Sequence, residues 1–582
     1  RSIWVTGVQT CALPIYIAMH ANTVGAFNTA AGAGALHNNT TGSNNAAFGY
    51  QAAHNNNADN ITALGYLTLF QNTTGVENTA TGYRALYSNT TGIKNTATGF
   101  MTMHANSTGV ENAAFGAVAL HHNSTGERNT AMGQSSLYFN TTGVQNTGTG
   151  FEALYKNTTG SQNTANGLAA LYNNTSGNNN TAMGSFVMFI GNGGNNNTGT
   201  GFRALFNNGG SDNTATGHES LRSNQTGSSN TAAGSNAMFA NTTGSRNSAY
   251  GAGALQATHI GSDNTAVGYQ ALQQNSSGQM NTAVGVQAGQ FGNHLENTAV
   301  GHWALRNGGS RSTAIGTFSL VLNTGNSNTA VGISSMQNNT SGSFNTALGS
   351  LALRGNTTGE LNVAVGEGSI FENTTGKYNT GIGLASLATN RTGSHNTALG
   401  AEADMLFDNL ENATAVGFHA VVDASNKVRI GNSAVTVIEG QVPFTTPSDG
   451  RFKFNVEEDV KGLDFIMQLR PVTYQFDVKR FDGKSAENIS MQAAYTEAEK
   501  IRRTGFIAQE VEKAAIKTGY NFSGVITPKK EGDHYSLSYD AFVVPLVKAV
   551  QEQQQVIDSQ NKKIANLQQQ LDEIKKLLQQ KK

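Results

Sequence analysis

The chain has 582 residues, of which 68 are Gly, 6 are Pro and 13% are charged, against about a quarter charged in ordinary globular domains. Its formal net charge of −1 excludes the basic surface that nucleic acids or anionic membranes require, so we expect no nucleic-acid partner. No apolar run approaches the ~20 residues of a membrane span, and a single cysteine, Cys11, excludes an internal disulfide framework.

The first residues differ from everything that follows. Residues 5–15 read VTGVQTCALPI and resemble the translation of a sequencing-library adapter, so we interpret residues 1–15 as an artefact. The next segment, YIAMHANTVGAFNTA at 16–30, aligns without a gap with FMTMHANSTGVENAA at 100–114. The native sequence therefore begins in mid-repeat. We expect a fragment without its true N-terminus, in which any signal peptide is not visible.

A repeat occupies residues 16–432. The typical unit is G-Y/F-x-A-L-x-x-N-T-T-G-x-x-N-T-A-x, as around Asn78–Gly82 and Asn129–Gly133. It recurs roughly two dozen times with a period of about 17 residues, which predicts one coil of a parallel all-β solenoid per unit. We expect two short strands per coil, on NTA-x and on Y-x-A-L. N-T-T-G and the recurrent Gly would form corners, because Asn and Gly tolerate left-handed backbone.

The repeat also predicts how the shaft is stabilised. Ala, Leu, Val and Met at fixed phases would point inward and form a narrow core, while Asn and Thr of successive coils would form side-chain ladders. Tyr, Phe and Leu of the Y-x-A-L segment would be exposed in one chain. Three chains side by side would bury them, so we predict a homotrimeric shaft.

No catalytic or metal site is apparent in the repeats. His121 and His122 form a predicted surface pair without a partner at metal-ligand spacing, and we expect no metal and no cofactor. Glu77, Glu111 and Glu127 fall in the slot before NTA and indicate solvated corners. The N-x-S/T triplets arise from the repeat itself. Outward Asn, Thr and aromatic residues suit contact with a cell-surface glycan or receptor, and an inert spacer fits them equally well.

The repeats resemble the heads of trimeric autotransporter adhesins, whose short N-S/T-x-A-x-G coils form a left-handed β-roll trimer. The resemblance covers residues 16 to 432 and implies an extracellular adhesive rod. Those heads have somewhat shorter coils, so the handedness of the solenoid stays open.

Identical coils can pair one coil out of register at little cost, so a trimer needs a non-repetitive segment that sets the register. The composition changes after a neck at 433–447. The spacing of apolar residues in 456–469 predicts a helix, and alternation in 470–476 predicts a strand. Residues 504–513 indicate a strand that leads into a helix, and 535–550 lead into the C-terminal helix.

That last helix has heptad spacing, which predicts a coiled coil over residues 546–582. Gln553 and Gln560 interrupt one of its two core series and could form a polar layer that fixes the register. The alternative is a single amphipathic helix that packs on its own domain. The core positions are Val543, Val550, Ile557, Ile564, Leu571 and Leu578 in one series, and Leu546, Leu567 and Ile574 in the other.

The stretch SDGRFKFNV begins at Ser448 and places Lys453 five residues later. A serine hydroxyl is a poor nucleophile until a base takes its proton. A lysine serves as that base only when desolvation lowers the pKa of its ammonium group from about 10.4 toward neutrality. Phe452 and Phe454 flank Lys453 and would help to exclude water. Taken alone, S-D-G-R is an ordinary turn.

Four segments in this order, SDGRFKFNV, GLDFIMQLRPVTYQF, GFIAQEV and YSLSYDAFVVPLVKAV, resemble the C-terminal intramolecular chaperone domain of phage tailspikes, tail fibres and endosialidases. We place that domain at 448–545. The resemblance implies a small α+β domain that trimerises, sets the register of a fibre and then cuts itself off once as an auto-endopeptidase.

The resemblance further implies a Ser448–Lys453 catalytic dyad and a cut between Pro447 and Ser448. Asp449 and Arg451 match the motif and would hold the turn. Phe452 and Val456 depart from it, since the family more often has Leu and Ile there.

We therefore expect a trimeric tail fibre or surface adhesin, on a virion or a bacterial cell surface, with a self-cleaving C-terminal domain. One alternative is a fibre that keeps this domain as a permanent trimeric foot. Another is an ice- or surface-binding solenoid, which we rank low because NTA offers one outward Thr per coil.

Overall fold

The structure is a computed structural model that describes residues 11–12, 17–192, 194–442, 444–482, 491–529 and 533–581. Most of the presumed adapter segment, residues 1–10 and 13–15, lies outside the described residues. The chain forms two compact units, 1–392 and 393–582. The predicted fold class is confirmed: a parallel β-solenoid is followed by a small α+β region and a C-terminal helix.

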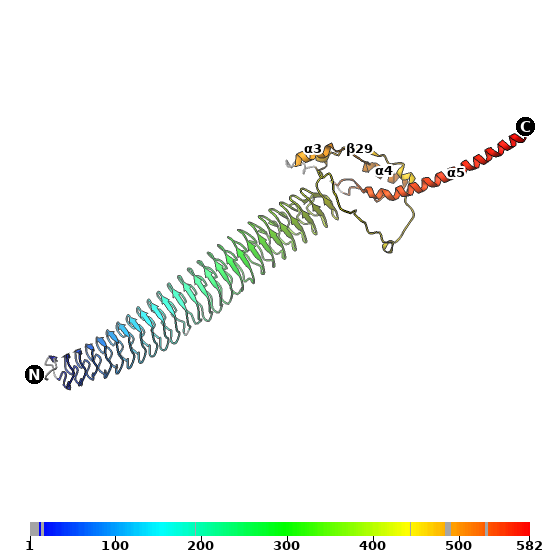
Figure 1. Ribbon diagram of the computed structural model, residues 1–582. Helices are drawn as coiled ribbons and strands as arrows, with labels where there is room; N and C mark the ends of the chain where they lie inside the picture. Colours follow the sequence, from blue (N-terminus) through cyan, green and yellow to red (C-terminus); the bar gives the residue numbers. More distant parts are fainter. Residues whose placement is uncertain are drawn as a thin grey trace. The chain divides into compact units, whose positions relative to one another are not determined.

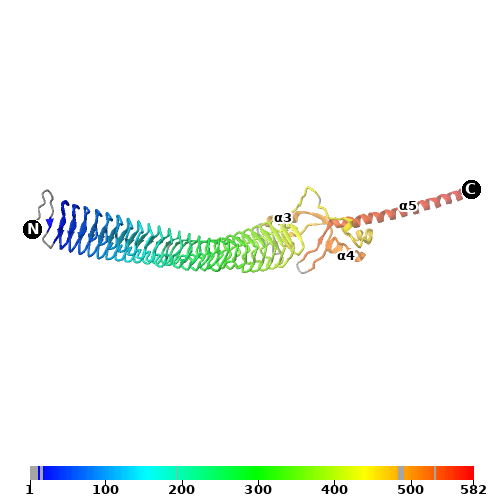
Figure 2. The same ribbon diagram turned by 90° about the horizontal axis from the view of Figure 1, so that it is seen from below.

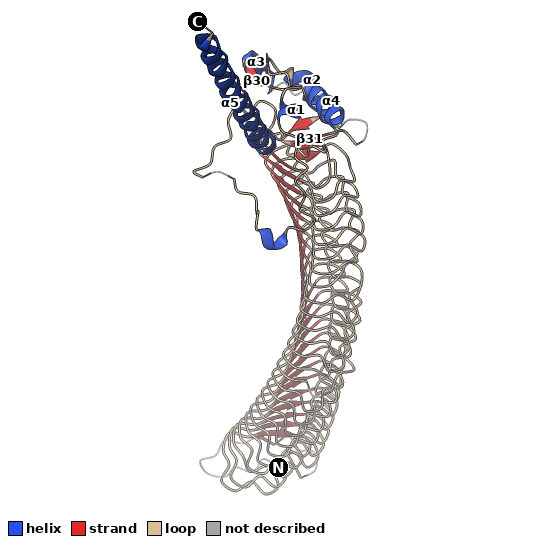
Figure 3. Ribbon diagram, turned by 90° about the vertical axis from the view of Figure 1, so that its right-hand side faces the viewer, coloured by secondary structure: helices blue, strands red, loops and turns tan. Residues whose placement is uncertain are grey.

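In the first unit each coil contributes one short strand, formed by the NTA-x motif. Successive strands pair in parallel and in register, so that Thr79, Ala80 and Thr81 lie beside Thr96, Ala97 and Thr98 of the next coil. The coils stack in sequence order (Figure 2), and their strands follow one side of the solenoid (Figure 3). The strands are β1 (Cys11–Ala12), β2 (Thr29–Ala31), β3 (Ala46–Phe48), β4 (Thr62–Leu64), β5 (Thr79–Thr81), β6 (Thr96–Thr98), β7 (Ala113–Phe115), β8 (Thr130–Met132), β9 (Thr147–Thr149), β10 (Thr164–Asn166), β11 (Thr181–Met183), β12 (Thr198–Thr200), β13 (Thr214–Thr216), β14 (Thr231–Ala233), β15 (Ser248–Tyr250), β16 (Thr265–Val267), β17 (Thr282–Val284), β18 (Thr298–Val300), β19 (Thr313–Ile315), β20 (Thr329–Val331), β21 (Thr346–Leu348), β22 (Val363–Val365) and β23 (Thr380–Ile382).

The prediction of a second strand on Y-x-A-L is wrong. This segment is a run of turns in which alternate residues have positive φ, such as Arg84 (51°) and Leu86 (50°). The alternation turns both Ala85 and Leu86 inward, where they are fully buried, whereas Tyr83 stays exposed. A non-Gly residue in this conformation costs about 1–2 kcal/mol. Hydrogen bonds between coils hold it there: the Leu86 N–H donates to the Thr102 carbonyl at 3.0 Å.

The Gly that follows each strand is required by the stacking. Gly82 has a φ of 128°, and a Cβ on it would lie 2.3 Å from the carbonyl oxygen of Gly99 in the next coil. A side chain at this position would therefore separate adjacent coils. The recurrent Gly was predicted as a corner, and its closeness to the next coil explains why no other residue fits.

Two ladders of buried Asn run through the interior. In the first, formed by the Asn of N-T-T-G, the Asn106 amide donates to Asn89 Oδ1 at 2.8 Å and to its own coil's Gly109 carbonyl at 3.2 Å. In the second, formed by the Asn of NTA, the Asn112 amide donates to Asn95 Oδ1 at 3.1 Å. The predicted ladders are confirmed for Asn. We had expected the Asn of N-T-T-G to supply left-handed corners, and this prediction is wrong. These Asn residues lie inside the coil and do not have positive φ.

The Asn ladder predicts a sharp contrast between two neighbouring residues. Asn339 is fully buried; its amide donates to Asn323 Oδ1 at 2.6 Å, and its own Oδ1 accepts from Asn356 at 2.6 Å. Asn339→Ala should destabilise the shaft by about 1–3 kcal/mol, because it leaves buried partners unsatisfied. Asn338→Ala, at an exposed site, should change stability by less than about 0.5 kcal/mol. Denaturant unfolding of both variants measures the difference, and equal midpoints would contradict it.

From residue 20 to residue 206, one position of every coil carries an aromatic ring, and these rings stack on one another. The position directly follows an inward Leu, Met or Ala such as Leu86. Neighbouring centroids are 4.9–5.5 Å apart, and Arg222 extends the row because its guanidinium lies 5.9 Å from the Phe206 ring. The predicted surface pair His121–His122 is partly buried instead, since His121 belongs to this stack. The rings are those of His20, His37, His54, Phe70, Tyr87, His104, His121, Tyr138, Tyr155, Tyr172, Phe189 and Phe206.

The stack predicts sensitivity to acid. Burial lowers the pKa of His121 to about 4, with smaller contributions from His122 and His104. The unfolded chain binds a proton at this residue below about pH 6.5, whereas the folded chain does not until about pH 4. Stability should therefore fall as the pH is lowered through this window. His121→Tyr, which keeps a ring in the stack, should reduce the loss of thermal stability between pH 7 and pH 4.5. An unchanged loss would show that His121 does not cause it.

The second unit begins with the last coils and continues with the α+β region (Figure 1). Strands β24, β26 and β28 pair in parallel, β25 pairs with β27, and β29–β30 and β31–β32 are antiparallel pairs. The elements are β24 (Thr397–Leu399), β25 (Asp404–Met405), β26 (Thr414–Val416), β27 (Val421–Val422), β28 (Val428–Ile430), the 3-10 helix η1 (Gly450–Phe452), α1 (Leu463–Ile466), β29 (Val472–Tyr474), α2 (Val478–Asp482), α3 (Gln492–Lys500), β30 (Arg503–Gly505), α4 (Ala508–Thr518), β31 (Val525–Ile526), β32 (Ser536–Leu537), the 3-10 helix η4 (Tyr539–Phe542) and α5 (Val543–Gln580).

Most of the C-terminal elements agree with the sequence. The strand predicted in 470–476 is β29, the strand and helix of 504–513 are β30 and α4, and the long terminal helix is α5. The helix predicted over 456–469 is wrong, since only the single turn α1 forms. Gly462 packs against the α5 backbone, where a Cβ would lie 2.7 Å from the Ala549 nitrogen. The segment therefore approaches α5 through Gly462, and not through the apolar face of a long helix that the sequence indicated.

Candidate self-cleavage site

The predicted site lies on a short 3-10 turn that its own residues stabilise. Asp449 caps η1 by accepting a hydrogen bond from the Arg451 N–H at 2.9 Å. The Arg451 guanidinium also donates to both Asp449 carboxylate oxygens, at 3.1 and 2.9 Å from Nε. Hydrogen bonds from the Arg451 side chain, and then from its backbone, lower the pKa of Asp449. These hydrogen bonds join the two residues across the turn, and no proton transfer is assigned to them.

The turn brings the two predicted catalytic side chains together. Lys453 Nζ donates a hydrogen bond to Ser448 Oγ at 2.7 Å. This distance lies within the range expected for a nucleophile and its base. Ser448 precedes the N-cap residue Asp449 and Lys453 is the C-cap of η1, so the local backbone brings the two side chains together. The same pair would be a simple surface hydrogen bond if the lysine kept its proton.

The site is exposed to water in the single chain. Ser448, Asp449, Arg451 and Lys453 are all exposed. Phe452 and Phe454, which we expected to shield the lysine, are 81% and 85% exposed. The shielding prediction is therefore wrong for one chain on its own, because every residue from 444 to 459 is exposed. Lys453 can act as a general base only if another part of the chain, or another chain, shields its side chain from water.

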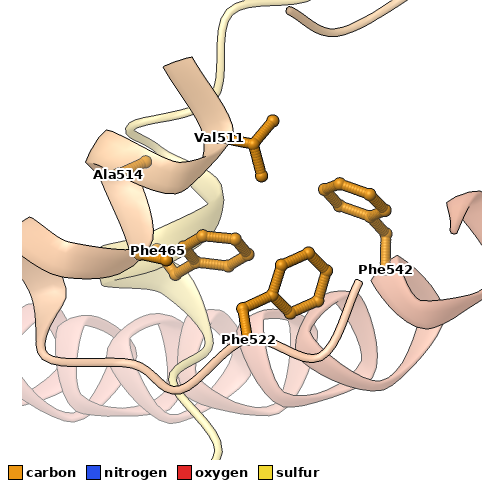
Figure 4. Close-up of a cluster of buried hydrophobic side chains, with 6 residues drawn as sticks. Phe465, Val511, Ala514, Phe522 and Phe542 are labelled. Carbon is orange, nitrogen blue, oxygen red and sulfur yellow. The ribbon is translucent and has the colours of Figure 1, made fainter. Parts of the chain in front are cut away.

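After this turn in the sequence, the chain forms a compact aromatic core. Figure 4 shows Phe465, Phe522 and Phe542 converging beneath Val511 and Ala514 of α4. These side chains join α1, α4 and the segments before α5 into one cluster. The Leu463 N–H, at the start of α1, also donates to the Glu552 carboxylate on α5 at 2.6 Å. Sequence reasoning missed Glu552, because a lone acidic residue in a Gln-rich helix carries no signal.

The core predicts a matched pair of Phe variants. Phe465→Ala should destabilise this region by about 3–5 kcal/mol, because the side chain is fully buried. Phe454→Ala, at a site exposed in one chain, should change the stability of the monomer by less than about 0.5 kcal/mol. Every helix that the structure describes longer than a 3-10 turn lies in the second unit, so loss of helical circular dichroism on heating measures this region alone. Equal melting of the two variants would contradict the prediction.

The described parts of the chain contain neither a metal-binding group nor a membrane-spanning helix. No group of three or more His, Cys, Asp or Glu side chains in them could hold a metal ion. Among the helices so described, none is long and apolar enough to cross a membrane.

Comparison with known proteins gives one family match, which includes the Ser448–Lys453 site. No curated protein matches the chain. A family model does match, and it begins at the residue that the motif singled out. Residues 448–520 match Peptidase_S74, the chaperone of endosialidase, which confirms the resemblance found in the sequence.

Proposed function

We propose that this chain is a subunit of an extracellular homotrimeric fibre, on a virion tail or a bacterial surface, whose C-terminal domain aligns three chains and then cleaves itself off between Pro447 and Ser448. The observation that carries the cleavage is the 2.7 Å contact between Lys453 Nζ and Ser448 Oγ. The family match at 448–520 supports the chaperone role.

The proposed chemistry needs only the chain itself and water. Neutral Lys453 takes the proton of the Ser448 hydroxyl, and Oγ attacks the Pro447 carbonyl carbon. The Pro447–Ser448 C–N bond then breaks; the proton held by Lys453 passes to the departing Ser448 nitrogen, and an ester links Pro447 to Oγ. Water hydrolyses this ester, which leaves a carboxylate on Pro447 and a free amine on Ser448. No side-chain donor to the oxyanion is assigned, so backbone N–H groups are the default.

The exposure of Lys453 supports a proposal that cleavage follows assembly. In one chain Lys453 is exposed, and Phe444, Phe452, Phe454 and Val456, which lie near it in the sequence, are 79–91% exposed. A neighbouring chain that covers these side chains would remove the water. Cleavage would then follow trimerisation and would not occur in free monomers.

The terminal helix supports a trimer. Its N-terminal part packs on its own domain, with Pro545 and Ala549 buried. Further along, the heptad residues Val550, Ile564 and Leu578 are 61–64% exposed. The sequence left open a coiled coil or a helix packed on its own domain, and α5 shows the second only near its start. We propose that the remainder forms a three-stranded coiled coil with two other copies.

The shaft would contact a cell-surface glycan or receptor, and its outward Asn and Thr side chains suit such a ligand. The aromatic stack suits it less, because each ring covers the face of the next. Five strands, β5, β6, β9, β12 and β13, have outward Thr at both ends, more than the one per coil that we expected. No more than two of them are consecutive, so an ice-binding face stays disfavoured.

Self-cleavage predicts a specific mass. The expressed chain should yield a C-terminal fragment that begins at Ser448. Ser448→Ala and Lys453→Met should stay whole, because they remove the nucleophile and the base. Thr446→Ala, an exposed neighbour outside the dyad, should cleave normally. Intact-mass spectrometry measures all four. If the wild type stays whole but is trimeric, the domain is a permanent foot and Lys453 is structural.

The proposed order of events predicts a second result. Ile564→Asp combined with Leu571→Asp should prevent the coiled coil, because carboxylates would face one another in its core. Cleavage should then fall at least tenfold, measured as the fraction of whole chain after purification. The control Gln568→Asp with Lys575→Asp, at positions outside both core series, should cleave normally. Normal cleavage of a monomeric Ile564→Asp/Leu571→Asp chain would overturn the requirement for a trimer.

A further inference from the structure

The third residue of each strand points outward and changes character along the shaft. In β16–β23 it is aliphatic in every strand, and we call this set the aliphatic row: Val267, Val284, Val300, Ile315, Val331, Leu348, Val365 and Ile382. In β2–β15 the same position is mixed: polar residues interrupt the apolar ones at Thr81, Thr98, Thr149, Asn166, Thr200 and Thr216. The continuous row is therefore confined to the half of the first unit that is nearer in sequence to residue 392.

Five of the eight side chains of the aliphatic row are exposed, and Val300, Val331 and Val365 are half-buried. Val284, Ile315 and Leu348 are 37%, 40% and 40% exposed. Neighbouring strands lie only about 4.8 Å apart, so each side chain shields the flanks of the next. The area that stays exposed is the outer face of the row. The row follows the side of the solenoid on which the strands lie (Figure 3).

Further apolar side chains widen the line into a face. Ile333, in the position after the recurrent Gly, and Phe344, in the slot before NTA, are both 60% exposed. Others in these two positions are Tyr269, Val286, Met280, Leu361 and Tyr378, all 41–53% exposed. The position after Gly is also apolar and exposed in the other half, as at Tyr66, Tyr83 and Phe100, so the third strand position alone distinguishes the two halves. Soluble monomers rarely expose so extended an apolar patch. Its residues approach in number the ~20–30 that each partner contributes to a standard interface.

We propose that the strand face of residues 265–382 is the surface along which three copies of this chain pack, and that the strand face of residues 29–250 lies outside that interface. This inference rests on the proposed trimer and adds which face and which half of the shaft form it. The solvent-exposed half would then be the part available to a ligand.

The spacing of the row identifies a second copy as the occupant. The row places one aliphatic side chain on every coil over eight successive strands. A globular partner has no reason to match that repeat, whereas another copy of the chain has the same row at the same spacing. Three parallel copies in register bring their rows to a common axis, where each side chain meets its equivalents. No member of the row is charged. Charged residues in the two flanking positions are Glu296 and Arg311, whose side chains pair with each other at 3.5 Å, and Glu367.

Cysteine cross-linking tests the face directly. In a Cys11→Ser, Ser448→Ala chain, Leu348→Cys should be joined between chains by a short bismaleimide in most molecules. Thr98→Cys, at the same strand position in the other half, and Thr358→Cys, at the exposed N-T-T-G corner, should each be joined at least fivefold less. Light scattering on the same samples gives the number of chains.

The outcomes separate the two proposals. A monomeric parent chain would overturn the trimer, and the interface with it. A trimer that links through Thr358→Cys but not Leu348→Cys would retain the proposed function and overturn the face. Equal linking through Thr98→Cys and Leu348→Cys would overturn its restriction to one half.

A second variant tests the same face without cross-linking. In the cleaved shaft, Ile315→Asp with Leu348→Asp should raise the monomer fraction at least tenfold, while Thr81→Asp with Thr98→Asp should leave it unchanged. An unaffected Ile315→Asp/Leu348→Asp trimer would also overturn the proposal.

Discussion

The hydrogen bonds between successive coils are the constraint on which the rest of this structure depends. A coil of about 17 residues has room inside for little more than Ala, Leu and two Asn side chains. The Asn amides are satisfied only when another coil lies above or below, as between Asn89 and Asn106. No coil can therefore be stable alone, and the shaft gains stability only as coils accumulate. The positive-φ Leu residues persist for the same reason, because contacts with adjacent coils determine their conformation.

A strictly repeated interior also produces strictly repeated surfaces. Every outward position becomes a row along the shaft: a stack of rings in residues 20–206, a mixed row on the first strands and the aliphatic row on β16–β23. Such rows suit association with a second copy better than with any irregular partner. They also allow a slip by one coil at little energetic cost, since the next position presents a similar side chain. A chain with this shaft needs a separate element to set the register, and the region after residue 447 is the part of the chain that does not repeat.

The candidate cleavage site combines a local geometry with an environment that one chain lacks. Five residues of backbone suffice to place Lys453 against Ser448, and the Asp449–Arg451 pair holds the intervening turn. The proposed chemistry also needs a dry surrounding, which the exposed Phe452 and Phe454 do not provide in one chain. In the proposed function this division links cleavage to assembly. Once the aligning domain has left, the shaft would be held by a slow unfolding rate, because separated chains would no longer have a device for finding their register.

The sequence by itself determined the solenoid, its period, the buried Ala, the Asn ladders and the long terminal helix, because each depends on a pattern that repeats along the chain. It also singled out Ser448 and Lys453, since a contact between residues five positions apart needs little more than a turn. Tertiary structure alone decided that Y-x-A-L turns inward instead of forming a strand, because hydrogen bonds from adjacent coils stabilise a backbone that Leu and Arg avoid on their own. It likewise decided that 456–469 forms only one helical turn, because Gly462 must lie against α5. Such contacts join residues that no local pattern connects.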